Sequence, residues 1–288
     1  MANPTQPIRL IECPRDAMQG INEFIPTEVK AGYLNKLLKV GFDYLDFGSF
    51  VSPKAIPQMS DTADVIRLLD LKDVETELLA IVGNMRGAER AMEFDEVDVI
   101  GYPFSVSETF LQRNINSTIE SSLETALQLQ NLCEVKGKDL VIYVSMAFGN
   151  PYGDMWDPDI VAHYVDRLVS EDIETISLAD TVGTASPENV RMLFSQLIED
   201  FPKTSFGGHF HARPDRWEEK IDAAFEAGCT RFDGAILGFG GCPMAEDELV
   251  GNVATENLVN KFGVSGQLKL DMEKFAEAVA AAGEIFHI

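Results

Sequence analysis

The chain has 288 residues, 45% of them hydrophobic and 24% charged, so it is long enough to bury a large core. Its formal net charge is −24, from 47 acidic and 23 basic residues. A negative field of that size opposes binding to nucleic acid and to anionic lipid, which argues against both as partners. An anionic substrate would therefore need a local positive charge, supplied by an arginine or a metal ion.

The sequence carries no signal for export or membrane insertion. No uninterrupted apolar stretch reaches transmembrane length, and residues 1–10 lack the basic segment and apolar run of a secretory signal. The four cysteines form no CxxC pair, which favours reduced thiols over a disulfide framework. They are Cys13, Cys133, Cys229 and Cys242. We expect a cytoplasmic protein with no membrane partner.

Short apolar runs rich in β-forming residues alternate with longer segments of helical periodicity. Helix ends are recognisable: residues 26–41 stop at Gly41, and residues 184–202 carry Ser186 as a cap with Pro187 at the first helical position. The eight predicted strands are residues 8–13, 44–50, 77–83, 96–104, 140–149, 175–180, 204–211 and 231–237.

Strict alternation of strands and helices predicts a parallel sheet with right-handed crossovers. Eight such units fit a closed (β/α)₈ TIM barrel. An open doubly wound sheet is the alternative, although the absence of GxGxxG after the first strand counts against its dinucleotide-binding version. The chain after residue 245 predicts additional C-terminal helices. We therefore expect one catalytic barrel domain over residues 1–288, with residues 245–288 as a helical extension packed on it.

Two of the four histidines lie close together in GGHFHARPDR, residues 207–216. In a strand, His209 and His211 point to the same face because side chains alternate with period two. Two imidazoles on one face can converge on a single metal ion. The pair alone is also compatible with ordinary strand histidines, or with one core histidine beside an exposed one.

The barrel interpretation places other polar residues near these histidines. Chemistry in such barrels takes place at the C-terminal ends of the strands and in the loops that follow. Each residue alone has a structural alternative, such as a helix cap, an ion-pair partner or an inert small side chain. The residues expected at this rim are Arg15, Asp16, Asp46, Asp180, His209, His211, Cys242 and Asn252.

The sequence resembles the 3-hydroxy-3-methylglutaryl-CoA lyase family, within the wider group of metal-dependent barrel enzymes that make or break bonds at acyl-CoA carbons. The resemblance runs nearly end to end, and the GFGGCP loop followed by GN-ATE-LV is its most specific part. The motifs are ECPRDAMQ (12–19), DFGSFVSPKAIPQM (46–59), RNINSTIESS (113–122), ISLADTVGTASP (176–187), GGHFH (207–211), GFGGCPMA (238–245) and GNVATENLV (251–259).

This resemblance implies a divalent metal held by Asp16, His209, His211 and Asn252. Two nitrogen and two oxygen donors without a thiolate suit Mg²⁺ or Mn²⁺. Zn²⁺ is disfavoured, because structural zinc sites are more often closed by four ligands that commonly include cysteine. A substrate alcohol bound to such a metal becomes more acidic, so a base can remove its proton and trigger carbon–carbon cleavage.

The resemblance also implies catalytic roles. Arg15 is expected to stabilise the thioester enolate, and Cys242 to protonate the product carbanion. Asp46 is expected to orient Arg15 and the metal-binding aspartate, and His209 to belong to the catalytic set as well as to the metal ligands. The expected substrate contacts are Gln19 and Asp180.

Several departures from the family pattern leave the acyl group open. Ala212 and Arg213 replace the usual Asp-Thr after the second histidine, and Asp46 is one methylene shorter than the usual glutamate. Ala17 replaces a glycine, and Asn150 stands where cysteine is common.

We expect a lyase that cleaves 3-hydroxy-3-methylglutaryl-CoA, or a close analogue, to acetyl-CoA and acetoacetate or a related 3-oxo acid. The resemblance further implies a role in leucine degradation and a homodimer or higher homo-oligomer. One alternative is another metal-dependent aldolase or acyl-CoA condensing enzyme. A second alternative is a non-catalytic metal-binding barrel, which the presence of Arg15 and Cys242 argues against.

Overall fold

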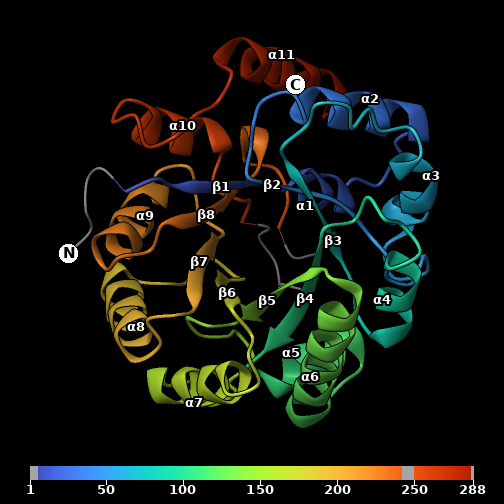
Figure 1. Ribbon diagram of the computed structural model, residues 1–288. Coiled ribbons are helices and arrows are strands. Elements are labelled where there is room, and N and C mark those ends of the chain that lie inside the picture. Colours follow the sequence, from blue (N-terminus) through green and yellow to red (C-terminus); the bar gives the residue numbers. More distant parts are fainter. Residues whose placement is uncertain (1–5, 242–249, 287–288) are drawn as a thin grey trace.

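The computed structural model describes residues 6–241 and 250–286. Eight parallel strands close into a barrel in sequence order, which confirms the predicted (β/α)₈ fold (Figure 1). Each predicted strand segment overlaps one observed strand. The strands are β1 Arg9–Glu12, β2 Tyr44–Ser49, β3 Glu77–Ile81, β4 Val99–Ser105, β5 Asp139–Ser145, β6 Thr175–Asp180, β7 Ser205–Phe210 and β8 Arg231–Gly234.

Two strands, β5 and β8, end three or more residues earlier than the sequence predicts, both at the C-terminal end of the barrel. β5 stops at Ser145 because Met146 takes a positive φ of 59°. β8 stops at Gly234, and Ile236–Gly238 then forms a 3₁₀ turn in which Leu237 has φ of 64°. A left-handed residue turns the chain out of the sheet, so in each case the expected end of the strand becomes a loop over the barrel mouth.

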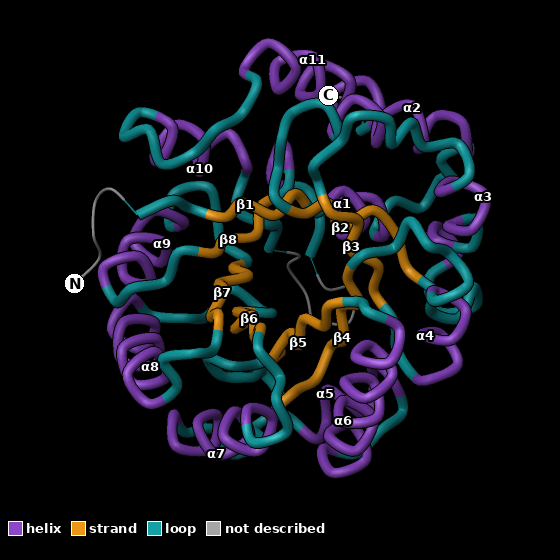
Figure 2. Tube along the Cα trace, in the orientation of Figure 1, coloured by secondary structure: helices purple, strands orange, loops and turns teal. Residues whose placement is uncertain are grey.

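Helices form an outer ring around the strands (Figure 2). Ser186 accepts a hydrogen bond from the Asn189 backbone and Pro187 opens the following helix, as predicted. The helices are α1 Pro14–Gln19, α2 Thr27–Leu37, α3 Thr62–Ile66, α4 Met85–Ala91, α5 Glu108–Ile115, α6 Ile119–Lys136, α7 Pro158–Val169, α8 Pro187–Asp200, α9 Trp217–Glu226, α10 Thr255–Gly263 and α11 Met272–Ile285.

The main hydrophobic core lies between the sheet and these helices, and a smaller apolar cluster fills the barrel interior. Because alternate side chains of each strand point inward, the interior residues come from neighbouring strands at matched heights. The interior cluster consists of Leu79, Ile81, Val99, Val141 and Tyr143. It closes the barrel below the mouth, so the polar side chains at the strand ends face solvent from one side only.

Of the two C-terminal helices, α10 contacts β8 and α11 packs against α2, and both contact the 3₁₀ turn Ile236–Gly238 (Figure 1). Phe275 of α11 makes an edge-to-face contact with Phe42, with ring centroids 6.4 Å apart. Phe286 stacks on Phe239, at 4.6 Å, just before the glycine-rich segment 240–241. The helical extension therefore supports the loop after β8. The assignment of all 288 residues to one domain stays a prediction.

Among the described residues, the helices are too short or too polar for a membrane crossing.

Candidate active site

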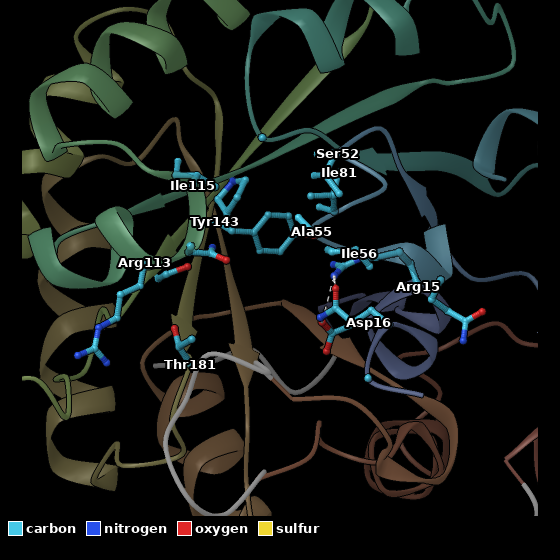
Figure 3. Close-up of a pocket in the computed structure, with 18 of the residues that line it drawn as sticks. Arg15, Asp16, Ser52, Ala55, Ile56, Ile81, Arg113, Ile115, Tyr143 and Thr181 are labelled. Atoms are coloured by element: carbon cyan, nitrogen blue, oxygen red, sulfur yellow. Dashed lines mark hydrogen bonds and ion pairs between the residues drawn. The ribbon is translucent and has the colours of Figure 1, made fainter. Parts of the chain in front are cut away.

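A cavity of about 650 Å³ opens at the C-terminal ends of the strands. Arg15 and Asp16 lie on one side of it, Arg113 and Ile115 on the other, with the ring of Tyr143 between them (Figure 3). The sides differ in character: the first carries the predicted functional residues, and the second combines apolar side chains with Arg113, Asn114 and Asn116. Residues on the first side are Arg15, Asp16, Gln19, His209 and His211.

Asp16 is held at the barrel mouth because α1 begins directly after β1, with Pro14 at its first position. Its Oδ1 accepts hydrogen bonds from Arg15 Nη1 at 3.1 Å and from Gln19 Nε2 at 2.6 Å. Its Oδ2 accepts one from Asn252 Nδ2 at 2.5 Å. Burial raises the pKa of Asp16, but Arg15 and the nearby histidines outweigh it and lower that pKa to about 2. Asp16 is therefore a carboxylate at neutral pH.

His211 presents a free ring nitrogen toward Asp16. Its Nδ1 lies 2.8 Å from the Thr181 carbonyl oxygen, which can only accept, so Nδ1 carries the proton. Nε2 is buried without a hydrogen-bond partner in the described parts of the chain, 3.9 Å from Asp16 Oδ2. Burial and the neighbouring His209 lower the pKa of His211. The result is a neutral imidazole with its lone pair directed into the site.

His209 lies on the same face as His211, as the strand spacing predicts, with the two ring centroids 5.2 Å apart. Its Nδ1 is 3.0 Å from Asp233 Oδ2 of the adjacent strand β8. Burial lowers the pKa of His209, but the hydrogen bond and charge of Asp233 outweigh it and the net shift is upward. The Asp233 contact fixes the ring and leaves Nε2 for the cavity.

Asn252 joins this group from the loop after β8, through an isolated antiparallel bridge to His211. Its amide nitrogen donates to Asp16 and to the Phe239 carbonyl oxygen. The amide oxygen is buried and lacks a partner among the described residues. A side chain at Gly240, whose φ is +107°, would clash with the Asn252 amide, so glycine is required for this close approach.

These donors fit a divalent cation. Ligand atoms of Asp16, His209 and His211 all lie within 4.8 Å of one another. Two buried atoms without a partner, His211 Nε2 and Asn252 Oδ1, belong to the same group. Unpaired buried polar atoms are costly and point to an additional binding partner. Imidazole nitrogens with carboxylate and amide oxygens form a donor set that suits a borderline-to-hard divalent ion.

The Arg15 guanidinium forms ion pairs with the carboxylates of Asp16 and Asp46. Its Nε lies 3.1 Å from Asp46 Oδ1, its Nη2 lies 2.5 Å from Asp46 Oδ2, and its Nη1 donates to Gln19 at 2.9 Å. Burial raises the pKa of Asp46 to about 6, against the opposing effect of Arg15. Asp46 thus holds the guanidinium as expected, and Gln19, for which a substrate contact is predicted, also binds it.

Asp180 is placed differently from the other predicted residues. Its buried carboxylate accepts hydrogen bonds from the backbone of Thr184 and Ala185 and from Lys220 Nζ at 2.6 Å. Within the described residues it does not line the cavity, whereas its neighbour Thr181 does. Asp180 therefore anchors the loop after β6 to α9, and its predicted substrate contact stays a prediction.

Ala212 and Arg213, where the chain departs from the family pattern, are not among the described residues that line the cavity. Cys242, the predicted proton donor, lies outside the described residues. Arg213 is largely exposed, with its Nε 3.8 Å from Asp215, and it is not among the described residues that line the cavity. Ala212 is buried. The departure at 212–213 therefore adds no charge to the described lining of the cavity.

The sequence interpretation missed Asp233 and the Thr181 carbonyl, the two groups that hold the histidines. A signal for Asp233 is present in hindsight: it is an acidic residue inside a fully buried strand, two positions from the buried Arg231. A charge there needs a partner. The backbone carbonyl of Thr181 gives no sequence signal.

A family model described as HMGL-like matches residues 9–281. A hydroxymethylglutaryl-CoA lyase of Bacillus subtilis, YngG, is 34% identical over 85% of this chain and 81% of its own length. A 3-hydroxy-3-isohexenylglutaryl-CoA/hydroxymethylglutaryl-CoA lyase of Pseudomonas aeruginosa is 33% identical over 96% and 92%.

A solved structure has the same fold across nearly the whole chain. The HMG-CoA lyase of Acinetobacter baumannii, in complex with coenzyme A and 3-methylmalate, matches with a TM-score of 0.90 and 28% identity, over 99% of this chain and 92% of that one. The barrel fold, the geometry of the site, the family model and the relatives all indicate the same family. The chain belongs to the HMGL-like family.

Proposed function

We propose that this protein is a divalent-metal-dependent carbon–carbon lyase that cleaves 3-hydroxy-3-methylglutaryl-CoA or a close analogue to acetyl-CoA and acetoacetate, or a related 3-oxo acid. The observation that carries the proposal is the convergence of Asp16, His209 and His211 at the mouth of a 650 Å³ cavity. Lyase names among the relatives, and the coenzyme A complex of the Acinetobacter enzyme, support the acyl-CoA substrate.

A cation in this donor group would be held by Asp16, His209, His211 and Asn252, and it would acidify the substrate alcohol. We assign Mg²⁺ or Mn²⁺ because oxygen and imidazole donors predominate. His209 also belongs to the catalytic set, because it keeps 12% of its side chain exposed at the cavity, against 4% for His211.

Loss of the alcohol proton breaks the carbon–carbon bond, so the former alcohol carbon becomes the 3-oxo group and the electron pair passes to the thioester fragment. Arg15 stabilises the resulting enolate, since the guanidinium is held rigidly by Asp46 and Gln19 and keeps its charge. Cys242 then donates a proton to the enolate carbon, which completes acetyl-CoA. Gln19 contacts substrate in this proposal, which its position in the cavity lining supports.

From the same family membership we infer a cytoplasmic location, a role in leucine degradation, and a homodimer or higher homo-oligomer.

The test is a coupled assay of purified protein with a panel of 3-hydroxyacyl-CoA thioesters, before and after chelation. The proposal expects metal-dependent release of acetyl-CoA from 3-hydroxy-3-methylglutaryl-CoA or a homologue. Release of a different fragment would assign the protein to the aldolase or condensing branch of these barrels. Absence of turnover in a metal-loaded, folded protein would leave a non-catalytic metal-binding barrel.

A further inference from the structure

A second group of metal-binding side chains adjoins the first one. Ligand atoms of Cys13, His209 and Asp233 all lie within 4.8 Å of one another. Cys13 follows β1 directly, and Asp233 lies on β8, where it pairs in register with Ile11 of β1. Cys13 and Asp233 are each 1% exposed. Neighbouring strands therefore gather a thiol, an imidazole and a carboxylate at one point inside the barrel mouth.

Asp233 and Cys13 have few hydrogen-bond partners among the described residues. Asp233 Oδ1 is buried without a hydrogen-bond partner among the described residues. Among the described residues, the Cys13 thiol makes one long hydrogen bond, to the Ile11 carbonyl oxygen at 4.0 Å. Asp233 is thus a nine-tenths buried polar side chain with one unused oxygen, next to a thiol that has no strong hydrogen bond. Unsatisfied buried polar atoms of this kind indicate an additional binding partner.

The types of donor atom indicate which cation would bind here. Thiolate, imidazole and carboxylate together are characteristic ligands of Zn²⁺, whereas Mg²⁺ and Mn²⁺ favour oxygen. We propose that Cys13, His209 and Asp233 form a binding site for a thiophilic divalent cation such as Zn²⁺, separate from the donor group of Asp16, His211 and Asn252.

Binding requires a proton balance. A cysteine binds a metal ion as its thiolate, so cation binding displaces the thiol proton of Cys13. His209 Nδ1 donates to Asp233 in the structure, so coordination through Nδ1 moves the ring proton to Nε2. One proton is therefore released from Cys13, and the other shifts across the ring of His209.

Sharing His209 makes the two sites alternatives. With the proton on Nε2, that nitrogen can no longer coordinate a cation beside Asp16 and His211. A thiophilic cation at Cys13 thus removes a ligand from the neighbouring group. The site inhibits the lyase by changing a histidine tautomer, without contacting substrate.

Co²⁺ provides a direct readout, because a cobalt–thiolate bond gives a charge-transfer absorption in the near ultraviolet that oxygen and imidazole ligands do not give. Metal-free protein titrated with Co²⁺ should develop this band at one equivalent. Cys13→Ser should abolish it, and Cys13→Ala is the second variant in case serine disturbs folding, with circular dichroism as the check.

Two matched variants test which thiol is involved. Cys229→Ser changes a buried thiol elsewhere in the barrel and should keep the band. Cys242→Ser, in the proposed lyase machinery, should also keep it. A band that survives in both folded Cys13 variants, or that disappears in Cys242→Ser, overturns the proposal. No band in the wild type overturns it as well.

Inhibition by Zn²⁺ is a further arm, and only this arm rests on the proposed lyase function. Zn²⁺ added to Mg²⁺-loaded enzyme should inhibit wild type at least roughly tenfold more strongly than Cys13→Ser, since one ligand is gone. Equal inhibition of the two proteins would contradict the regulatory role. If the protein proves not to be a lyase, the cobalt spectrum still decides whether the site exists.

Discussion

The side chains on the two sides of the cavity are held in place in different ways. On the metal-binding side, each polar group is oriented by a partner from another element: His209 by Asp233, His211 by the Thr181 carbonyl, and Arg15 by Asp46. The opposite wall, formed by β3 to β5 and α5, has an apolar part, here called the apolar wall, whose side chains are held by packing, and Arg113, Asn114 and Asn116 lie beside it. Wall residues include Ile81, Pro103, Phe110, Ile115 and Tyr143.

The difference indicates that the two sides of the cavity have different functions. Hydrogen-bonded partners fix the positions of donor atoms, which a metal site and a charged transition state require. A packed apolar wall excludes water and shapes the space for an acyl chain, and it tolerates small changes. Changes on the metal-binding side should therefore reduce turnover or metal affinity, whereas changes in the wall should act on substrate affinity.

Arg15→Lys is expected to have the largest effect among single conservative changes. Lysine keeps the charge but loses the planar fork that Asp46 and Gln19 hold. We predict that kcat falls by roughly 10²–10³ while metal affinity stays within about twofold. Steady-state kinetics with a metal titration measures both quantities. An unchanged kcat would place enolate stabilisation elsewhere.

Asp233→Asn tests whether a hydrogen-bonded partner matters as much as a ligand. A neutral amide no longer fixes which nitrogen of His209 carries the proton, so metal affinity should drop roughly 10–100-fold. Nitrogen NMR of the His209 ring in metal-free protein should show a mixture of tautomers. The matched control is Ser177→Ala, a buried β6 hydroxyl outside the described cavity lining, which should change neither reading.

Ile115→Ala tests the apolar wall. Removing three carbons from this side chain at the end of α5 should raise KM by roughly tenfold, because apolar contact with substrate is lost. Both kcat and metal affinity should stay near wild type. A drop in metal affinity instead would show that the two sides are not independent.

Glu12 gives the smallest effect, on stability rather than activity. Burial raises the pKa of this carboxyl to about 8, although it accepts hydrogen bonds from Thr255 and the Ile236 backbone. The folded state thus keeps a proton that the unfolded state loses above pH 4.5, so stability is full at acidic pH and falls as pH rises toward 8. Glu12→Gln should remove this decline. Thermal melts from pH 5 to 9 measure it, and parallel curves for both proteins would contradict it.

The barrel could be predicted from sequence because its strands and helices alternate with clear periodicity and recognisable caps. Ser186 with Pro187 marks a helix start, and β-rich runs mark each strand. The ends of β5 and β8 could not be predicted, because Met146 and Leu237 have a positive φ that their residue types do not favour.

The candidate site was predictable where ligands sit at strand ends, since topology alone brings Asp16 and His211 together. The groups that orient the ligands could not be predicted from the sequence. Asp233 faces His209 only because β7 and β8 pair, with Gly207 opposite Arg231. The ion pair of Asp180 could not be predicted either, because its partner Lys220 is distant in sequence.

The most direct test of the account is a count of Mn²⁺ ions bound per chain by equilibrium dialysis of wild type and His211→Ala. The wild type should bind one ion through the group of Asp16, His209, His211 and Asn252. His211→Ala should bind none at the same free Mn²⁺ concentration, since a ligand with a free ring nitrogen has been removed. Equal binding by the two folded proteins, or no binding by the wild type, would contradict the central claim.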